Sequence, residues 1–586
     1  PVIEVTIEEI VPAENEMQEK ILDIAKEVIG TEKTGITTDL FMVGLSSIGC
    51  IKLCSLLSDA FDVNIKVAEI FECKNVKSIE ALVNEKRDSG ENTVSYELRE
   101  SYPLTKTQMG IYVDSEVYEG TTVYNIPILY SLDPNVDLER LRDAIIKTFL
   151  AHPYLFMTLC DENGVIRAVR NQPEVFDIQI KDVMPELDDL VYPFDLTAGK
   201  RLFRVELFDT AKGKYFFVDI HHIVFDGWSL SVLRDDINRA YSGENVPVEK
   251  YTGYEAALDE EVALKTDRHG KAKAFYDSVF LGCGGETMPV KDGKFTESKI
   301  EYSEYTGEKN ADEVRDCCIK NGVSLNAFFT AAFGMALQTY TASEEVIFST
   351  IYNGRNDSRV ENSISMFVKT MPVRLEFIAE DSVRDTLKKC QNYLLSAMAN
   401  DIYSFAEISK AYGIGADILF AFQGEESGSM TIGGYPSKEI ELPLSQTMAP
   451  FDVDVYLIGN KIVYKAAIDP NVYSSYTING FLKLFDRIVS GFIEKETIGD
   501  IELVSEEDKK DILNLHDTKF TVKEKPAYRL LQDSAEKNPD KVALVAVDRT
   551  LIYRELNEEA NAVGHALIAE ARKVRTGLIA DSGHGP

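Results

Sequence analysis

The chain has 586 residues, of which 45% are hydrophobic and 27% are charged, and its formal net charge is −35. This length exceeds what one hydrophobic core can organise, so we expect roughly three to five folding units. The negative charge repels polyanions, which excludes nucleic acid as a partner. No apolar run approaches the ~18 residues that a membrane-spanning helix needs, and the first residues lack the features of a signal peptide.

The eight cysteines are scattered without a paired framework. Cys50 and Cys54 lie one helical turn apart and Cys317 adjoins Cys318, but neither pair has the further ligands of a zinc site. We therefore expect reduced, mostly buried thiols in a cytoplasmic protein without a metal. Five histidines without partners at ligand spacing are interpreted as surface or packing residues: His152, His269, His516, His565 and His584.

The first part of the chain shows the pattern of a small four-helix bundle. In Glu14–Gly30 apolar residues repeat every three or four positions, which predicts a helix with one buried face. A loop follows, and a second helix is predicted to begin near Ser47. Short helices at about Lys66–Phe71 and Ser78–Arg87 complete the bundle, before a polar linker.

Strands and helices alternate from Ser101 to Val504. Leu202–Phe208 and Tyr215–Ile220 flank a polar turn and predict a β-hairpin. The Gly-rich zone Lys265–Lys299 separates two such sets, which we interpret as two α/β lobes joined by a loose segment. Further predicted elements are the helices Trp228–Tyr241, Ala311–Asn321 and Leu325–Thr341, and the strands Ile300–Tyr305 and Glu345–Tyr352.

The pattern changes again after Glu506. Thr550–Leu556 begins an amphipathic helix, whereas Arg572–Pro586 loses periodicity, and we expect that tail to be disordered or vector-derived. The expected boundaries are 1–90 for the bundle, 91–100 for a linker, 101–275 and 276–505 for the two lobes, and 506–586 for the remainder.

The clearest chemical signal is a pair of adjacent histidines, His221 and His222, at the end of an apolar strand. Successive strand residues face opposite sides of a sheet, so one imidazole should point into a cleft and the other into the core. A cleft histidine has the proton affinity to take a proton from an attacking amine near neutral pH. Asp226 and Gly227 form a turn, and the carboxylate could orient this loop. The alternative is a strand end with two purely structural histidines.

These residues resemble the His-His-x-x-x-Asp-Gly signature of the condensation domains of nonribosomal peptide synthetases. Further stretches resemble the landmarks of that family, in the same order, from about Ser101 to Val504. They are Tyr102–Tyr112, which keeps Gln108; Ala151–Leu155, which lacks both arginines of the second motif; and Gly354–Arg374, where Lys369 replaces an asparagine.

The resemblance implies a V-shaped pair of chloramphenicol-acetyltransferase-like α/β lobes with a tunnel between them. His222 would be the active-site histidine at the midpoint of this tunnel, and His221 would be structural. Asp226 would brace the loop, paired with Arg355, and Gly227 would keep a backbone amide free near the developing oxyanion. Whether His222 abstracts the proton or positions the amine stays open.

A second motif, Asp39-Leu-Phe41-Met-Val-Gly44-Leu-Ser46-Ser47, resembles the attachment loop of carrier proteins. Aligned in this way, Ser47 is the attachment site of 4′-phosphopantetheine, and Ser46 is its rival because the preceding residue is Leu where Gly is usual. A phosphodiester at a helix N-terminus meets free backbone amides and the positive end of the helix dipole. Alternatively, either serine is only an N-cap.

The two resemblances together imply a carrier that presents a donor to the condensation unit that follows it. The unit would form an amide with an amine held by a downstream acceptor carrier, and the other implied partners are a phosphopantetheinyl transferase and an upstream adenylation domain. Thr550–Leu556 resembles the first adenylation motif, so 506–586 would be a linker and a truncated adenylation domain that does not bind ATP.

Four alternatives to the amide-forming unit remain. An epimerisation domain shares the histidine motif, but Trp228 directly follows Gly227, where epimerases usually read Val-Ser-Trp. The others are an ester-forming condensation domain, a catalytically silent scaffold that only docks carriers, and a free-standing acyltransferase that uses coenzyme A thioesters.

Overall fold

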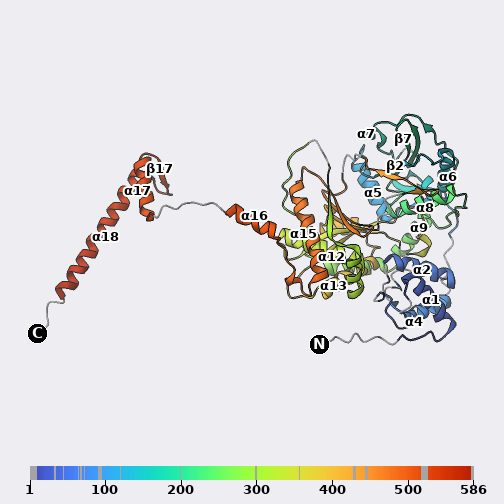
Figure 1. The fold of residues 1–586 in the computed structure, drawn as a ribbon, viewed down its shortest axis with the longest axis horizontal. Coiled ribbons are helices and arrows are strands. Elements are labelled where there is room, and N and C mark those ends of the chain that lie inside the picture. Colours follow the sequence, from blue (N-terminus) through green and yellow to red (C-terminus); the bar gives the residue numbers. More distant parts are fainter. Residues whose placement is uncertain are drawn as a thin grey trace. The chain divides into compact units, whose positions relative to one another are not determined.

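The computed structural model forms two compact units, residues 1–503 and 504–586. Figure 1 labels their helices and strands. The residues that the structure describes are 10–31, 34–41, 43, 45, 47–63, 65, 69–70, 73–89, 96–118, 120–197, 199–296, 300–355, 357–425, 430–442, 447–516 and 525–581.

The first helical part is a bundle of α1 (Glu16–Ile29), α2 (Ser47–Phe61) and α4 (Val76–Ser89), packed around aliphatic side chains. Helix α1 ends at Gly30, whose φ of 75° lies in the left-handed region that favours glycine. The three corresponding predicted helices are confirmed with small shifts at their ends. The fourth, at Lys66–Phe71, falls largely outside the described residues.

The N-terminal lobe is built on a five-stranded sheet in the order β14-β2-β7-β6-β5. Helices α6 (Leu138–Ala151) and α8 (Gly227–Tyr241) pack together and bury one face of this sheet (Figure 1). The predicted hairpin is confirmed as β6 and β7, which pair antiparallel. The strands are β2 (Asn125–Leu132), β5 (Ile180–Lys181), β6 (Phe203–Thr210), β7 (Gly213–His221) and β14 (Lys438–Ile440). A smaller sheet contains β1 (Ser101–Pro103), β4 (Val165–Val169) and β3 (Thr158–Glu162).

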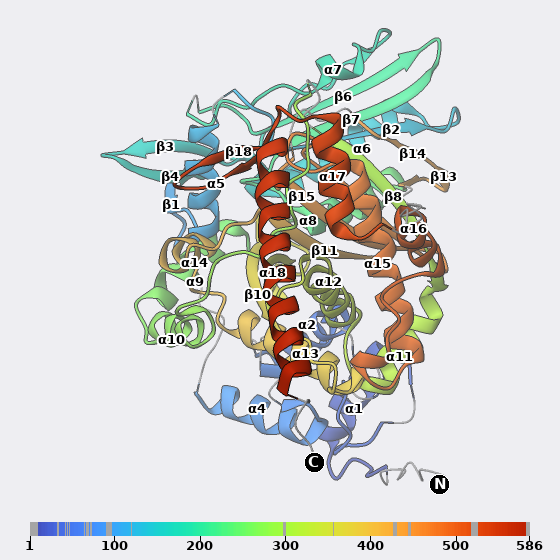
Figure 2. The same ribbon diagram turned by 90° about the vertical axis from the view of Figure 1, so that its left-hand side faces the viewer.

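The C-terminal lobe has a six-stranded sheet in the order β10-β9-β11-β15-β16-β8. Helices α12 (Leu325–Thr341) and α15 (Ser475–Glu494) run alongside its strands (Figures 1 and 2) and bury a cluster of aromatic rings against them. The strands are β8 (Glu301–Asn310), β9 (Val346–Tyr352), β10 (Lys369–Leu375), β11 (Ile418–Glu425), β15 (Phe451–Ile458) and β16 (Lys461–Ile468). Helices α11 (Ala311–Asn321) and α13 (Val383–Ala399) complete the lobe.

One strand crosses between the lobes. After β11 the chain leaves the C-terminal sheet, and β14 pairs antiparallel with β2 of the N-terminal sheet before the chain returns as β15. Glu439 of β14 also forms an ion pair with Arg234 of α8, with 3.0 Å between Nη2 and Oε2. The two lobes are therefore joined by main-chain hydrogen bonds as well as by the chain itself.

The prediction of a loose segment at Lys265–Lys299 is wrong over its first half. Helix α10 (Arg268–Phe280) lies there and buries Tyr276 and Phe280 in a cluster with side chains of the C-terminal lobe. The predicted boundary between 275 and 276 consequently falls inside a helix. Apolar residues spaced by four, starting at Ala272, were the available signal.

The second unit contains two helices, a two-stranded sheet and a long final helix. These are α16 (Glu506–His516), α17 (Ala527–Lys537), β17 (Val542–Val545), β18 (Thr550–Ile552) and α18 (Tyr553–Asp581). The prediction that the chain is disordered from Arg572 onward is wrong as far as Asp581, because α18 continues through that stretch. Strong helix formers such as Ala, Arg and Lys extend a helix without an apolar stripe.

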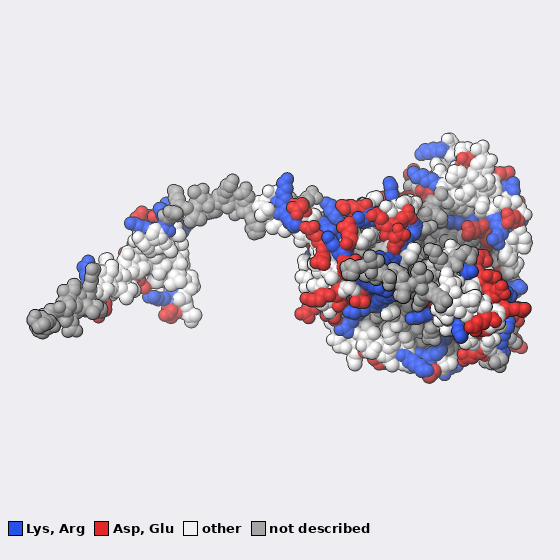
Figure 3. All heavy atoms as spheres, turned by 60° about the horizontal axis from the view of Figure 1, so that its bottom comes forward, with Lys and Arg blue, Asp and Glu red and all other residues white. Residues whose placement is uncertain are grey.

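Acidic and basic side chains are interspersed on the face shown in Figure 3. Among the helices of the described residues, none combines the length and the apolar character needed to cross a membrane.

Candidate active site

The two adjacent histidines lie where β7 ends. The backbone N–H of His221 donates to the Leu202 carbonyl at 2.9 Å, and that of His222 donates to the Tyr124 carbonyl at 2.8 Å. His221 is 4% exposed, whereas His222 is half-buried. The structure thus gives the two rings different surroundings, as strand alternation predicts.

The hydrogen bond made by the His222 ring fixes its tautomer. Its Nδ1 lies 2.9 Å from the Phe225 carbonyl oxygen. Because a carbonyl can only accept, Nδ1 carries the proton and Nε2 is left with its lone pair. Burial lowers the pKa of His222, and the nearby Asp226 carboxylate offsets only part of this effect. The ring is therefore neutral at neutral pH, with a basic nitrogen at Nε2.

His221 has a different environment on the core side. Its Nδ1 accepts a hydrogen bond from the Ile223 N–H at 3.1 Å. Burial lowers the pKa of His221 to about 3, and the neighbouring His222 and Arg204 act in the same direction. His221 therefore stays neutral, and its ring holds the turn that carries His222.

The predicted pair between Asp226 and Arg355 forms across the two lobes. Arg355 Nη1 and Nη2 lie 2.8 and 3.1 Å from Oδ2 and Oδ1 of Asp226, and both side chains are fully buried. Burial opposes the charge on Asp226, but the guanidinium and the backbone N–H groups of Phe367 and Ser229 outweigh it and hold its pKa below the usual range. The carboxylate also caps the N-terminus of α8.

Several side chains to which the sequence analysis gave no role in the site support this loop. Gln108, noted earlier only as a retained motif residue, donates from Nε2 to the Ile223 carbonyl at 2.8 Å and to the Tyr154 hydroxyl at 2.7 Å. Ser229 Oγ donates to the Ser365 carbonyl at 2.9 Å, and Trp228 Nε1 donates to the Glu361 carbonyl at 2.9 Å. Helix α8 is thereby fastened to the opposite lobe.

Gly227 is the first residue of α8 and borders open space. Its φ is not positive, and a Cβ added there would meet no atom within 4 Å. Neither backbone conformation nor internal packing therefore requires glycine at this position. A requirement for glycine would come instead from a molecule that passes close to the backbone.

Gly227→Leu is expected to leave the free energy of unfolding within about 1 kcal/mol of the wild-type value, since its side chain enters open space. The same side chain should obstruct substrate approach and lower turnover by about tenfold or more. Denaturant unfolding and a single-turnover condensation assay measure the two effects. Turnover equal to that of Gly227→Ala would show that the space beside α8 is not used.

The loop before α2 faces the C-terminal lobe. Within the loop, Asp39 Oδ1 accepts from the Phe41 N–H at 3.0 Å, and the Leu45 N–H donates to the Leu40 carbonyl at 2.9 Å. Helix α2 itself packs beside the short helix η2 (Ser358–Val360). The bundle is therefore seated on the segment that follows Arg355.

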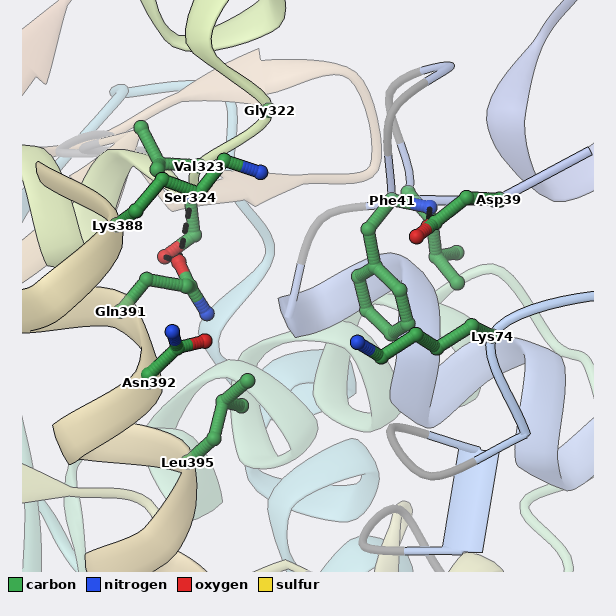
Figure 4. A pocket seen from close by; sticks show the side chains of 11 residues that line it. Asp39, Phe41, Lys74, Gly322, Val323, Ser324, Lys388, Gln391, Asn392 and Leu395 are labelled. Carbon is green, nitrogen blue, oxygen red and sulfur yellow. Dashed lines mark hydrogen bonds between the residues drawn. The ribbon is translucent and has the colours of Figure 1, made fainter. Parts of the chain in front are cut away.

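A cavity of about 70 Å³ lies between this loop and the C-terminal lobe (Figure 4). Phe41 and Lys74 approach it from the bundle, opposite Asn392 and Gln391 of α13. Burial lowers the pKa of Lys388, which also lines the cavity, and the positive charges of Arg384 and Lys74 add to that effect. The other lining residues are Asp39, Leu45, Gly322, Val323, Ser324 and Leu395.

Ser47 is the first residue of α2, while its side chain and the whole of Ser46 lie outside the described residues. A group attached to Ser47 would lie at the N-terminus of α2, the positive end of the helix dipole. This position suits a phosphodiester, and the cations of Lys74 and Lys388 beside the loop add positive potential. The arrangement therefore fits 4′-phosphopantetheine.

The Condensation domain family matches residues 98–513, and the Phosphopantetheine attachment site family matches residues 19–83. The chain belongs to the condensation-domain family. Its carrier domain precedes the condensation domain and bears the attachment site for 4′-phosphopantetheine. Gramicidin S synthase 2 of Aneurinibacillus migulanus is 26% identical over 585 residues, which cover 94% of this chain and 13% of that protein.

Solved structures support the fold of the condensation domain. The first condensation domain of the calcium-dependent antibiotic synthetase, in complex with a substrate analogue, covers 69% of this chain and 99% of its own, with 16% identity and a TM-score of 0.57. The epimerization domain from the third module of tyrocidine synthetase B covers 68% and 99%, with 18% identity and the same TM-score of 0.57. The two-lobe fold is thus confirmed, and the fold alone does not separate condensation from epimerisation.

The roles assigned to single residues stay predictions, as does the tunnel between the lobes, since the cavity in Figure 4 lies elsewhere. Within the described ranges, no group of three or more His, Cys, Asp or Glu side chains is arranged to hold a metal ion.

Proposed function

We propose that this chain is the donor carrier and condensation unit of a nonribosomal peptide synthetase, and that it forms an amide between the carrier-bound donor and the amine of an amino acid on a downstream carrier. The observation that carries the proposal is the state of His222. Its ring is half-buried and neutral, and the hydrogen bond at Nδ1 leaves Nε2 as the nitrogen that can accept a proton.

The residues around His222 supply proton transfer and orientation. Nε2 accepts the proton that the acceptor amine loses as its nitrogen bonds to the donor carbonyl carbon. The bond from that carbon to the donor sulfur then breaks, and the proton passes from Nε2 to the departing sulfur. The Asp226–Arg355 pair holds the loop, so the imidazole keeps its position while the charges change. The N-terminus of α8, beginning at Gly227, presents the positive end of a helix dipole beside this loop, where negative charge on the carbonyl oxygen would be stabilised.

When attached to Ser47, 4′-phosphopantetheine supplies the thiol that carries the donor. In the attachment loop before α2, Asp39 accepts a hydrogen bond from the Phe41 N–H, and both residues border the cavity with α13. We propose Ser47 rather than Ser46 because Ser47 is the residue at which the helix begins.

Loading of Ser47 gives a direct test of the carrier site. Incubation with a phosphopantetheinyl transferase and coenzyme A is expected to add one cofactor mass to the wild-type chain and none to Ser47→Ala, measured by intact mass spectrometry. Ser46→Ala is the matched control and should load fully. A cofactor-sized gain in Ser47→Ala would move the attachment site to the neighbouring serine.

The competing activities leave different products. With a loaded donor and a soluble acceptor amine, condensation yields an amide, whereas epimerisation exchanges the donor Cα hydrogen with solvent deuterium and yields no new bond. A hydroxyl acceptor in place of the amine detects an ester-forming unit. A scaffold that only docks carriers gives no product with any acceptor.

The proposed partners are an upstream adenylation domain that charges the carrier and a downstream acceptor carrier, and the proposed location is the cytoplasm. The family matches imply modification by a phosphopantetheinyl transferase. We also propose that part of the second unit is the start of an adenylation domain. The segment that begins at Thr550 forms strand β18 and continues directly into helix α18, which is compatible with this proposal.

A further inference from the structure

His152 is a buried histidine with a carboxylate on each ring nitrogen. It follows α6 and is 2% exposed. Its Nε2 lies 2.9 Å from Asp236 Oδ2, on α8, and its Nδ1 lies 3.1 Å from Glu249 Oε2. The sequence interpretation of His152 as a surface or packing residue is therefore incomplete, because the side chain is buried in an ionic cluster.

Two carboxylates on one ring favour its charged form. A neutral imidazole has one N–H and can donate to only one of the two carboxylates, whereas the imidazolium donates to both. Burial would lower the pKa of His152, but the hydrogen bonds to Asp236 and Glu249 outweigh it and raise the pKa to about 9. Arg239 is a more distant cation of the cluster, 3.7 Å from Asp236 Oδ1, and Glu255 adds negative charge near Glu249.

One of the two carboxylates leads from His152 to the candidate active site. Glu249 accepts a hydrogen bond from the hydroxyl of Ser363, in the segment that follows Arg355. The Ser363 carbonyl in turn accepts from Arg355 Nη2 at 3.1 Å, and the same guanidinium holds Asp226. The backbone N–H of Glu249 also donates to the Ala151 carbonyl at 2.9 Å, which keeps Glu249 beside the histidine.

The other carboxylate does not extend this path. Asp236 lies on the helix that Asp226 caps, and its further contact is with Arg239 on the same helix. Both carboxylates therefore neutralise the same imidazolium, but among the described residues the hydrogen bonds that connect it to Arg355 run through Glu249. The pair offers a matched comparison within one cluster.

We propose that His152, as an imidazolium, is a positioning residue of the condensation site. It holds Glu249, and Glu249 holds Arg355 in place through Ser363. Arg355 in turn fixes Asp226, on the loop that carries His222. This inference rests on the proposed function of the chain. The inference gives the second sequence motif, which lacks both arginines of the family motif, a cation of its own that acts on the active site through Glu249.

The test compares Glu249→Gln with Asp236→Asn in the full-length chain. A phosphopantetheinyl transferase loads each variant from an aminoacyl-coenzyme A thioester, and an aminoacyl-N-acetylcysteamine thioester supplies the acceptor amine. The donor and acceptor are the pair that the wild-type chain converts fastest in a panel of such compounds. Product formation by the wild-type chain establishes the proposed function separately. The comparison between variants then tests only the inference.

Glu249→Gln is expected to lower kcat by about tenfold or more with a change in the acceptor KM below about threefold. Asp236→Asn should lower kcat by less than about threefold, although each variant replaces one charged acceptor of His152 with a neutral amide and the two should have similar melting temperatures. Ser363→Ala removes the link while leaving the three-residue cluster intact, and it should reproduce the loss of kcat. Its small, neutral change keeps the test valid should Glu249→Gln fold poorly.

Two kinetic outcomes would overturn the inference. Equal losses of kcat in Asp236→Asn and Glu249→Gln would mean that the cluster only stabilises the lobe. Wild-type kcat in Ser363→Ala would mean that the path to Arg355 has no role. Histidine nitrogen NMR gives an independent reading, since both ring nitrogens of His152 should be protonated at pH 7, and a neutral ring would contradict the assigned charge.

Discussion

Replacing His222 with alanine is expected to slow amide formation by about 100- to 10,000-fold, the usual contribution of a positioned acid–base group. The variant loses Nε2, the nitrogen left to accept a proton, while the backbone contact of residue 222 with Tyr124 is retained. Loading of the carrier should be unchanged because the attachment loop is separate from this site. Single-turnover assays with loaded carrier measure the first effect, and intact mass measures the second.

His221→Ala serves as the contrasting variant, since the His221 ring is buried and supports the turn. It should lower stability as well as turnover, whereas His222→Ala should affect mainly turnover. The pKa of His222 is lowered by burial, so an NMR titration of its ring should give a value below the reference of about 6.5. The ring is then neutral above that pH and loses its basic nitrogen as the pH falls. Undiminished turnover in His222→Ala would remove this residue from the mechanism.

The second large effect is expected for Arg355→Met. Asp226 would be left buried without its cation, and breaking one side of a buried ion pair costs about 3–5 kcal/mol. Turnover should also fall, because the loop between His222 and Gly227 loses its anchor in the other lobe. Denaturant unfolding measures the loss of stability, and the condensation assay measures the loss of turnover.

The double variant Asp226→Asn with Arg355→Met separates charge from packing. Removing both charges should recover most of the free energy of unfolding, since neutral replacement of a buried pair is often tolerated. In Arg355→Met alone, burial should raise the pKa of Asp226 above its unfolded value of about 3.9. The deficit in stability is then present at neutral pH and shrinks as the pH falls and the carboxylate is protonated. A deficit independent of pH in Arg355→Met would rule out the buried charge as its cause.

Local patterns in the sequence predict much of this fold. The repeat of apolar residues every three or four positions predicted α1, and the polar turn predicted the hairpin of β6 and β7. Both elements depend on residues that are close together in the sequence. Helix α10 was missed because a Gly-rich zone around it resembled a linker, and its partners Ile347 and Ile408 come much later in the chain. The end of α18 was missed because a helix can continue on propensity alone.

The candidate site likewise has a part that the sequence predicts and a part that only the fold creates. The motif containing His222 and Asp226 was visible as a short pattern, and the pairing with Arg355 followed from the family resemblance. The contacts that only the fold creates were not visible, such as that between Trp228 and the Glu361 carbonyl. The charge of His152 depends on two carboxylates that lie 84 and 97 residues away in the sequence, which no spacing rule would connect.

The crossing strand β14 limits how this chain can be divided. It hydrogen-bonds through Lys438–Ile440 to β2, although it belongs in sequence to the C-terminal lobe. An N-terminal lobe expressed alone would expose the edge of β2, and an unpaired edge strand favours aggregation. Recombination that exchanges modules should therefore transfer both lobes together. A junction placed between the lobes would separate the N-terminal sheet from its edge strand β14.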